Sequence, residues 1–469
     1  MNSFQVGFAR VNINPELGTP VAGYYIPRFA KGFLDDLEVN AVAYALGETR
    51  VLMLSLDSCG THKPLSDMLR QDVSEATGVP VSHVFLHTTH SHTAPINNPA
   101  QLARNADGDP GTIAGYDKVV RYVEFLRHRV ADAAVLALAD LKEAKMGFIQ
   151  GWAPERVAYI RRYRMKDGSV MTCPPINDPN IDHPLGQLDQ RVHVLRFDRV
   201  GGDTVVLVNY GLHADTINGE RISADWPGWM RRTVEKVLPE TKCVFFNGAE
   251  GDVGSTHVFP EGGDMNDTEI SFDNEMKSPG MARFVGRALA GTVLQVYDKV
   301  EYVPVERLEV LQKTVTVPAN VPTPEQLPLA HKYNDPHNAG RDDLIPYKAM
   351  ELTTVVAEAA RMVQLENGPD TFCLELMGVA IGDVALVGFP GEPFTDIGVQ
   401  TKDTPGWKAI MPCCLTGGSM GYFPMRSAFD EGGYEARSSR YVAGISHEPG
   451  IQWLDAIDRA LYPSAHAGY

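Results

Sequence analysis

The alternation of apolar and polar positions predicts a strand–helix–strand unit early in the chain. Residues 51–57 form an apolar run of strand length, and residues 84–89 begin with a second one. The stretch 64–77 between them has the spacing of an amphipathic helix. A helix that connects two such strands favours a right-handed crossover and a parallel pair. We therefore expect these two strands to lie in one sheet.

The same periodicities predict the other main elements. A long amphipathic helix is expected over 116–141, because its interior contains neither proline nor glycine. Its apolar stripe consists of Val119, Val120, Val123, Leu126, Val130 and Ala134. Further helices are predicted over 226–238, 279–300 and 345–365, and further strands near 143–150, 192–198, 203–210, 242–247 and, as a pair, 374–389. This order predicts an α/β fold, a large layered domain with a mixed, largely parallel central sheet flanked by helices.

Two segments have no clear periodicity. Residues 258–277 carry six acidic side chains among glycines and predict an acidic surface loop, because the spacing of a calcium-binding loop is missing. Residues 317–345 are rich in proline and asparagine and predict an irregular connection between two lobes, or a flap.

Size and charge exclude several classes of protein. At 469 residues the chain exceeds the length at which one hydrophobic core usually stops growing, so two lobes or one large layered domain are expected. Its net charge of −17 opposes nucleic acid and anionic membranes as partners. No apolar run approaches the roughly 20 residues that a membrane-spanning helix needs.

The cysteines and the N-terminal residues indicate a cytoplasmic protein. The six cysteines show no CxxC spacing, and Cys413 and Cys414 are adjacent, which is typical of a reducing compartment. The first residues lack the basic region and the apolar core of a signal peptide.

Three histidines, His87, His90 and His92, lie within six residues at the end of the apolar run that begins at Val84. If that strand stays extended, His90 and His92 share one face and His87 points the other way. Imidazole is a common zinc ligand, so this cluster predicts a metal site. His213 follows the strand near 203–210 and is either a packed histidine or a third imidazole of the same site.

Two carboxylates follow other predicted strands. Asp252 lies in the glycine-rich turn 246–255, where it could serve as a general base or cap the next segment. Glu392 lies in a Pro-Gly turn after an apolar strand, where burial of a carboxylate is costly unless it is paired or bound to a metal. Its alternative role is to cap the helix that follows.

Two other motifs offer alternatives to this metal site. Gly417-Gly-Ser419-Met-Gly421 matches the G-x-S-x-G elbow of serine hydrolases, but that elbow must lead into a helix and Tyr422-Phe-Pro424 follows at once. We interpret it as a chance match. The HxHxDH motif of metallo-β-lactamases is excluded, because no Asp-His pair follows His92.

Five segments, in the same order, resemble motifs of the neutral (non-lysosomal) ceramidase family. Thr89-His-Ser-His-Thr-Ala-Pro95 resembles THTHSGP, Gly251-Asp-Val253 resembles GDxSPN, and Pro390-Gly-Glu-Pro393 resembles PGEP. Gly421-Tyr422, with Tyr434 in the segment 431–435, resembles GY…QYE. The resemblance covers nearly the whole chain, from Val6 to about Glu448.

The resemblance implies a set of site residues. One zinc ion would be bound by His90, His213, Glu392 and Tyr422. His92 would contact the substrate oxygen, and Asp252 would be the base for the water. Arg161 would be the substrate-binding arginine, with Arg162 equally compatible by spacing, and Tyr434 would be its phenol partner.

The resemblance also bears on domains and on the nucleophile. Because the implied ligands come from both halves, we expect a single composite catalytic domain over 1–469, with sub-lobes 1–316 and 346–469 joined by 317–345. A C-terminal immunoglobulin-like domain is not expected. Gly254 stands where the family has a serine, and Ser255 comes one position late, which argues against a serine nucleophile.

The predicted function is a zinc-dependent hydrolase that cleaves the amide bond of an N-acyl compound by a zinc-activated water. His92, Arg161 and Tyr434 would donate hydrogen bonds to the tetrahedral oxyanion. The expected partner is a small N-acyl substrate, lipid-like ones included; the sequence defines no oligomeric state. Two alternatives stay open: a serine hydrolase that uses Ser419, and a non-catalytic protein whose zinc is structural.

Overall fold

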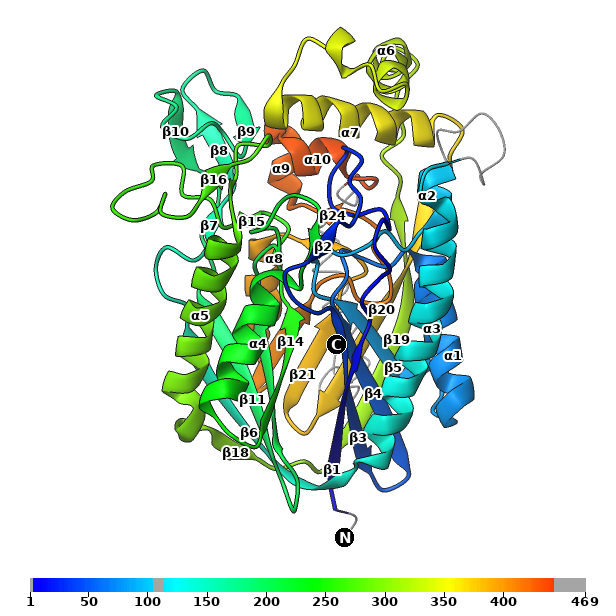
Figure 1. The fold of residues 1–469 in the computed structure, drawn as a ribbon, viewed down its shortest axis with the longest axis vertical. Coiled ribbons are helices and arrows are strands. Elements are labelled where there is room, and N and C mark those ends of the chain that lie inside the picture. Colours follow the sequence, from blue (N-terminus) through cyan, green and yellow to red (C-terminus); the bar gives the residue numbers. More distant parts are fainter. Residues whose placement is uncertain (1–2, 104–112, 443–469) are drawn as a thin grey trace, which may run out of the picture.

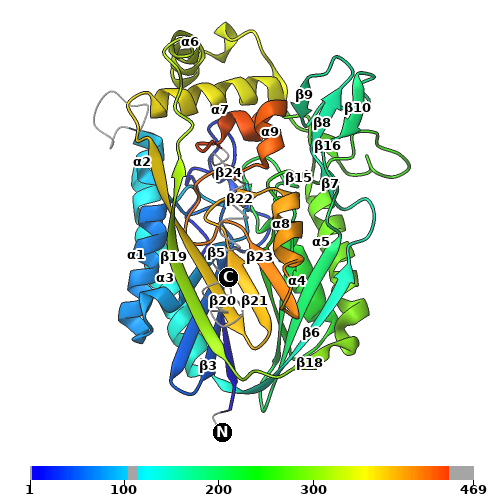
Figure 2. The same ribbon diagram turned by 180° about the vertical axis from the view of Figure 1, so that it is seen from behind.

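A nine-stranded sheet forms the centre of the part of the chain that the computed structural model describes, residues 3–103 and 113–442 (Figures 1 and 2). Its strand order is β14-β12-β11-β6-β1-β3-β4-β5, with β18 paired to β6. The strands are β1 (Gln5–Asn12), β3 (Glu38–Leu46), β4 (Thr49–Leu56), β5 (Val84–Thr88), β6 (Lys142–Trp152), β11 (Arg191–Arg199), β12 (Thr204–Tyr210), β14 (Thr241–Asn247) and β18 (Glu301–Val303). A four-stranded sheet contains β19 (Leu308–Pro318), β20 (Thr371–Ile381), β21 (Val384–Gly388) and β23 (Ala409–Cys413).

Most neighbouring strands in the two large sheets are antiparallel. The parallel pairs are β4–β5, β12–β14 and β21–β23. The prediction of a mixed sheet is confirmed, but the prediction of a largely parallel one is wrong. Strands β3 and β4 are joined by a short turn at Gly47, and β11 and β12 by one at Gly201, and such tight connections produce antiparallel neighbours.

Side-chain alternation along the strands generates the layers. On β1, Ala9 and Val11 pack toward helices, whereas Val6 and Phe8 pack toward the four-stranded sheet. Helices α1 (Lys63–Thr77) and α3 (Tyr116–Ala139) cover one half of the nine-stranded sheet, on the right of Figure 1. Helices α4 (Asp225–Val237) and α5 (Pro279–Val296) cover the other half, on the left.

The half of the sheet covered by α1 and α3 contacts the half covered by α4 and α5 at two places. Strands β1 and β6 share only the pairs Gln5–Glu143 and Val6–Lys142. At the other place the backbone N–H of Asn247 donates to Nε2 of His87 at 2.9 Å, and Nδ1 of His87 lies 3.2 Å from Oγ of Ser55. Burial lowers the pKa of His87 to about 3, so the ring is neutral. His87 therefore connects the sheet halves.

The five predicted helices are present, and the longest of the additional helices among the described residues lies in the segment 317–345. Helix α7 (Ala349–Leu365) matches the last of them, and α6 (Leu327–Asn338) lies within the segment predicted to be irregular. Both helices lie at the top of Figure 1. On α3 Val120 is exposed, and Tyr122 takes its place in the buried stripe. No helix of the described ranges has the length and apolar character that a membrane crossing needs.

Short elements complete the described ranges. They are β2 (Gly32–Phe33), α2 (Pro99–Ala103), β7 (Tyr159–Ile160), β8 (Arg162–Met165), β9 (Val170–Thr172), β10 (Ile181–Pro184), β13 (Arg221–Ile222), β15 (Val253–Gly254), β16 (Glu269–Ile270), β17 (Met276–Lys277), β22 (Glu392–Pro393), α8 (Thr395–Lys402), β24 (Tyr422–Phe423), α9 (Arg426–Glu431) and α10 (Tyr434–Ser438). The end of the sequence resemblance, near Glu448, lies outside the described residues, and the division into two sub-lobes stays a prediction.

Candidate metal centre

The candidate side chains come from segments that directly follow strands. His90 comes after β5 and His213 after β12, while Glu392 opens β22 just after β21. Strand β24 pairs in parallel with β22 and places Tyr422 opposite Glu392. In Figure 2, which labels both, these two short strands lie in the half of the molecule that is remote from the N-terminus.

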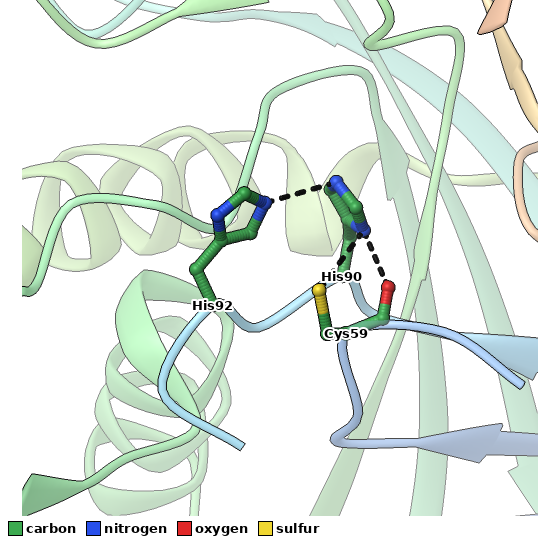
Figure 3. A group of neighbouring side chains, drawn as sticks. All are labelled: Cys59, His90 and His92. Carbon is green, nitrogen blue, oxygen red and sulfur yellow. Dashed lines mark hydrogen bonds between the residues drawn. The ribbon is translucent and has the colours of Figure 1, made fainter. Parts of the chain in front are cut away.

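His90 has an uncommon backbone conformation. Strand β5 ends at Thr88, and His90 has φ +70°, in the left-handed region that residues other than glycine rarely adopt. The chain therefore turns at His90, and the expectation that His90 and His92 share one face of an extended strand is wrong. The turn nevertheless brings the two rings together, with their Nε2 atoms 3.1 Å apart (Figure 3).

Backbone carbonyl groups fix the proton positions on two imidazoles. Nδ1 of His90 lies 2.5 Å from the carbonyl oxygen of Cys59 (Figure 3). Nδ1 of His213 lies 2.8 Å from the carbonyl oxygen of Glu250 and 3.1 Å from that of Val253. Because a carbonyl oxygen only accepts, both Nδ1 atoms carry a proton. When neutral, each ring keeps a lone pair on Nε2.

These two Nε2 atoms converge on one carboxylate oxygen. Oε2 of Glu392 lies 3.5 Å from Nε2 of His90 and 3.4 Å from Nε2 of His213. Among the described residues neither Oε2 of Glu392 nor Nε2 of His213 has a hydrogen-bond partner, although both are buried. Ligands bound tetrahedrally at about 2.0–2.1 Å from zinc lie about 3.3–3.4 Å apart, so both distances suit a zinc ion held between Glu392 and the two imidazoles.

The electrostatic potential at the place where Glu392 meets the two imidazoles favours a cation. Burial works to raise the pKa of Glu392, but His90 and His213 outweigh it and lower that pKa to about 2. Burial likewise works to lower the pKa of His90, yet Glu392 and Glu250 raise it well above the usual value. The carboxylates thus create a negative potential where the imidazoles meet.

Glu250 is a residue of this group that the sequence analysis missed. Ligand atoms of His90, His213, Glu250 and Glu392 all lie within 4.8 Å of one another, and all four residues are buried. Glu250 follows β14 in the glycine-rich turn that was examined for Asp252. A carboxylate directly after a buried strand was the signal that could have indicated it.

Arg161 and Tyr422 contact each other beside the imidazoles. Nη2 of Arg161 donates to the hydroxyl oxygen of Tyr422 at 3.1 Å and to the carbonyl oxygen of Gly251 at 2.9 Å. Its Nε donates to Oε1 of Glu435 at 2.8 Å. The ring of Tyr434 packs edge-on against that of Tyr422, with ring centres 5.5 Å apart. These contacts hold the guanidinium and both phenols on one side of the site.

Arg162 has a different environment. Its Nη2 donates to Oε2 of Glu431 at 3.1 Å and to the carbonyl oxygen of Gly432 at 2.9 Å. A cavity is lined by Arg161, His92, Tyr422 and Tyr434, and Arg162 is not among its lining residues. The sequence left these two arginines equivalent, and the structure places Arg161 at the cavity.

The remaining cavity wall is aromatic and acidic. It includes Gly23, Tyr24, Tyr25, Cys173, Asp215, Phe272, Asp273, Glu275, Met350 and Thr353. Asp273 and Glu275 belong to the segment 258–277, which was predicted to lie on the surface. Both are buried, because their carboxylates surround the fully buried ammonium group of Lys277 at 3.0 and 2.8 Å.

Asp252 has its carboxylate turned toward a helix. Its Oδ1 accepts from the backbone N–H and from the hydroxyl of Thr395, both at 2.8 Å, at the first residue of α8. Asp252 is not among the residues that line the cavity. This geometry corresponds to the capping alternative, and its role as a base stays a prediction.

The sequence offered two serines as possible nucleophiles, and the structure does not support this role for either of them. Ser419 is followed by strand β24, whereas a nucleophile elbow needs a helix at that point. Ser255 lines a different cavity, together with Tyr159 and His257.

Fold and site together define a class of protein: a layered α/β domain with a buried imidazole–carboxylate group that can hold a metal ion. Solved structures share this fold. Neutral ceramidase from Pseudomonas aeruginosa matches with a TM-score of 0.71 at 15% identity, over 99% of this chain and 75% of that one. A ceramidase complexed with C2 matches with a TM-score of 0.70 at 15% identity, over 99% and 76%.

The chain therefore has the fold of neutral ceramidase, and the resemblance found in its sequence is confirmed at the level of the fold. No family model matches the chain, and no curated protein sequence matches it.

Proposed function

We propose that the protein is a zinc-dependent hydrolase that cleaves the amide bond of an N-acyl compound. The observation that carries the proposal is the convergence of Nε2 of His90, Nε2 of His213 and Oε2 of Glu392 at 3.4–3.5 Å. Two imidazoles and one carboxylate form a ligand set found in catalytic zinc sites. The shared fold of the ceramidase structures supports the reaction class.

In this proposal His90, His213 and Glu392 hold the zinc, with Tyr422 as a fourth ligand beside Glu392. When bound, zinc supplies Lewis-acid chemistry, which polarises a carbonyl group and acidifies water. The contact between Arg161 and the hydroxyl oxygen of Tyr422 supports this role, because a guanidinium stabilises negative charge on a phenol.

Arg161 and Tyr434 are assigned to the developing oxyanion. Burial works to lower the pKa of Arg161, but Tyr422 and Glu435 outweigh it and raise that pKa well above the usual value. The guanidinium is therefore charged, and its contacts with Gly251 and Glu435 hold it in place without reorganisation. Donors fixed in advance stabilise charge that appears in the transition state.

We assign proton transfer to His92, through its own Nε2 atom. His92 lines the cavity, and its Nδ1 lies 3.3 Å from Oδ2 of Asp215. Burial, followed by the charges of His90 and His213, lowers the pKa of His92 well below its usual value, so the ring is neutral. Asp252, which contacts α8, supports that helix in this proposal.

We infer the substrate class from the similar solved structures, which are ceramidases, and from the residues that line the cavity. An N-acyl compound presents the carbonyl that the site would polarise. The cavity lined by Arg161 and His92 also carries tyrosines and carboxylates. Its tyrosines and carboxylates would bind hydroxyl or amino groups on the amine side of the substrate.

Elemental analysis and a substrate panel test the proposal. Purified protein should contain one zinc per chain and should hydrolyse at least one N-acyl amine. A chelator should abolish this activity, and added zinc should restore it. Activity that survives complete removal of metal but is lost to a fluorophosphonate would favour Ser419, and stoichiometric zinc without hydrolysis would favour a structural metal.

A further inference from the structure

Glu250 is a fully buried carboxylate with few partners. Its side chain has 0% exposure, and Oε2 is in ion-pair contact with Nδ1 of His213. Within the described ranges neither carboxylate oxygen has a hydrogen bond of normal geometry. A charge in such a position is unfavourable unless a positive group offsets it.

The groups around Glu250 that can carry positive charge are the imidazoles of the centre. The thiol of Cys414 lies beside it, and burial, followed by the carboxylate of Glu250, raises the pKa of that thiol well above its usual value. The thiol is therefore protonated and neutral. Among the described residues of this group, His90 and His213 can carry positive charge close to Glu250, in addition to whatever cation the centre holds.

His90 and His213 differ in what faces their Nδ1 atoms. Nδ1 of His90 faces the neutral carbonyl oxygen of Cys59. Nδ1 of His213 faces carbonyl oxygens and, in addition, the carboxylate of Glu250. A carboxylate at this position orients a metal-binding imidazole and makes it a stronger donor.

We propose that Glu250 is a positioning residue of the metal centre, which raises the affinity for zinc by holding His213 through Nδ1. This inference rests on the zinc site of the proposed function. Glu250 acts through His213 and is not itself a ligand, because Nε2 of His213 faces Glu392 at 3.4 Å while Glu250 contacts the other ring nitrogen.

Glu250→Gln tests the proposal, because glutamine keeps the shape and removes the charge. We expect one zinc per chain and a Kd raised about 10- to 100-fold, measured by competition with a chelating indicator. The absorption spectrum of the cobalt-substituted protein should keep its ligand-field bands. Asp252→Asn is the matched control: it removes a buried carboxylate from the same turn but contacts α8, so its zinc Kd should equal that of the wild type.

Three results would overturn the inference or its basis. A zinc affinity of Glu250→Gln equal to that of the wild type excludes the positioning role. Complete loss of zinc at every concentration makes Glu250 a ligand and overturns the proposal in its stated form. Wild-type protein that binds no zinc contradicts the proposed function itself. If Glu250→Gln does not fold, Glu250→Asp is the second test. Its shorter side chain keeps the charge but moves it away from His213, so this variant must also bind zinc more weakly.

Discussion

Nζ of Lys277 lies 2.7 Å from Oδ2 of Asp215, and the same oxygen lies 3.3 Å from Nδ1 of His92. The ammonium group is fully buried and also contacts the carboxylates of Asp273 and Glu275. The hydroxyl oxygen of Tyr24 lies 2.6 Å from it. One buried cation thus connects the segment after β16 to the cavity that contains the candidate catalytic histidine.

Replacement of Lys277 should destabilise the protein strongly. Lys277→Met leaves three buried carboxylates without their cation, and breaking a buried ion pair costs about 3–5 kcal/mol. Urea unfolding of the metal-free protein measures this loss. Lys408→Met is the control, because Lys408 pairs with Glu301 at the surface, with side chains 41% and 72% exposed, and its loss should be much smaller. Equal losses in the two variants would contradict the structural role of Lys277.

Local pattern was sufficient for the elements whose partners are close in sequence. The stretch 51–89 predicted the parallel pair β4–β5, because strand, helix and strand follow one another. The antiparallel majority of the sheet was missed, because β1 and β3 were not recognised as strands. The fold of 317–345 depends on packing of α6 against α7, which its composition does not reveal.

The candidate site, like the fold, could be predicted from local sequence only in part. Motifs indicated His90, His213, Glu392 and Tyr422, and the structure brings these side chains together. The geometry of His90 could not be predicted, because its left-handed backbone interrupts the strand alternation. Lys277 and Asp215 are 62 residues apart, and nothing in either local pattern specifies that they neutralise each other. Glu275 therefore looked like a surface residue.

The histidines and Glu392 should separate into two groups on substitution. His90→Ala and Glu392→Ala should lose stoichiometric zinc together with activity, because each removes one of the converging atoms. His92→Ala should retain zinc and lose about 10²–10⁴-fold in kcat, which is the usual contribution of a proton-transferring group. Metal analysis alongside steady-state kinetics distinguishes the groups. Loss of zinc from His92→Ala would show that the division between the two histidines is wrong.

The two neighbouring arginines should respond differently to lysine. Arg161→Lys removes fixed donors from the cavity and should lower kcat/KM about 100-fold or more, with zinc content unchanged. Arg162→Lys should leave kcat/KM within a few-fold, because Arg162 contacts Glu431 and Gly432. Circular dichroism checks that both variants fold. A larger kinetic loss in Arg162→Lys would reverse the assignment.

Asp252 should make the stability of the metal-free protein fall as the pH rises. Burial raises the pKa of Asp252 from 3.8 to about 6, even though Thr395 donates two hydrogen bonds to it. The folded state then binds the proton more tightly than the unfolded state does. This contribution is fully present below pH 3.8 and is lost as the pH rises through 6. The difference in unfolding free energy between wild type and Asp252→Asn should therefore shift against the wild type by up to about 3 kcal/mol across this window. Urea unfolding at several pH values, in the presence of a chelator, measures it. A difference independent of pH would show that Asp252 ionises normally in the folded protein.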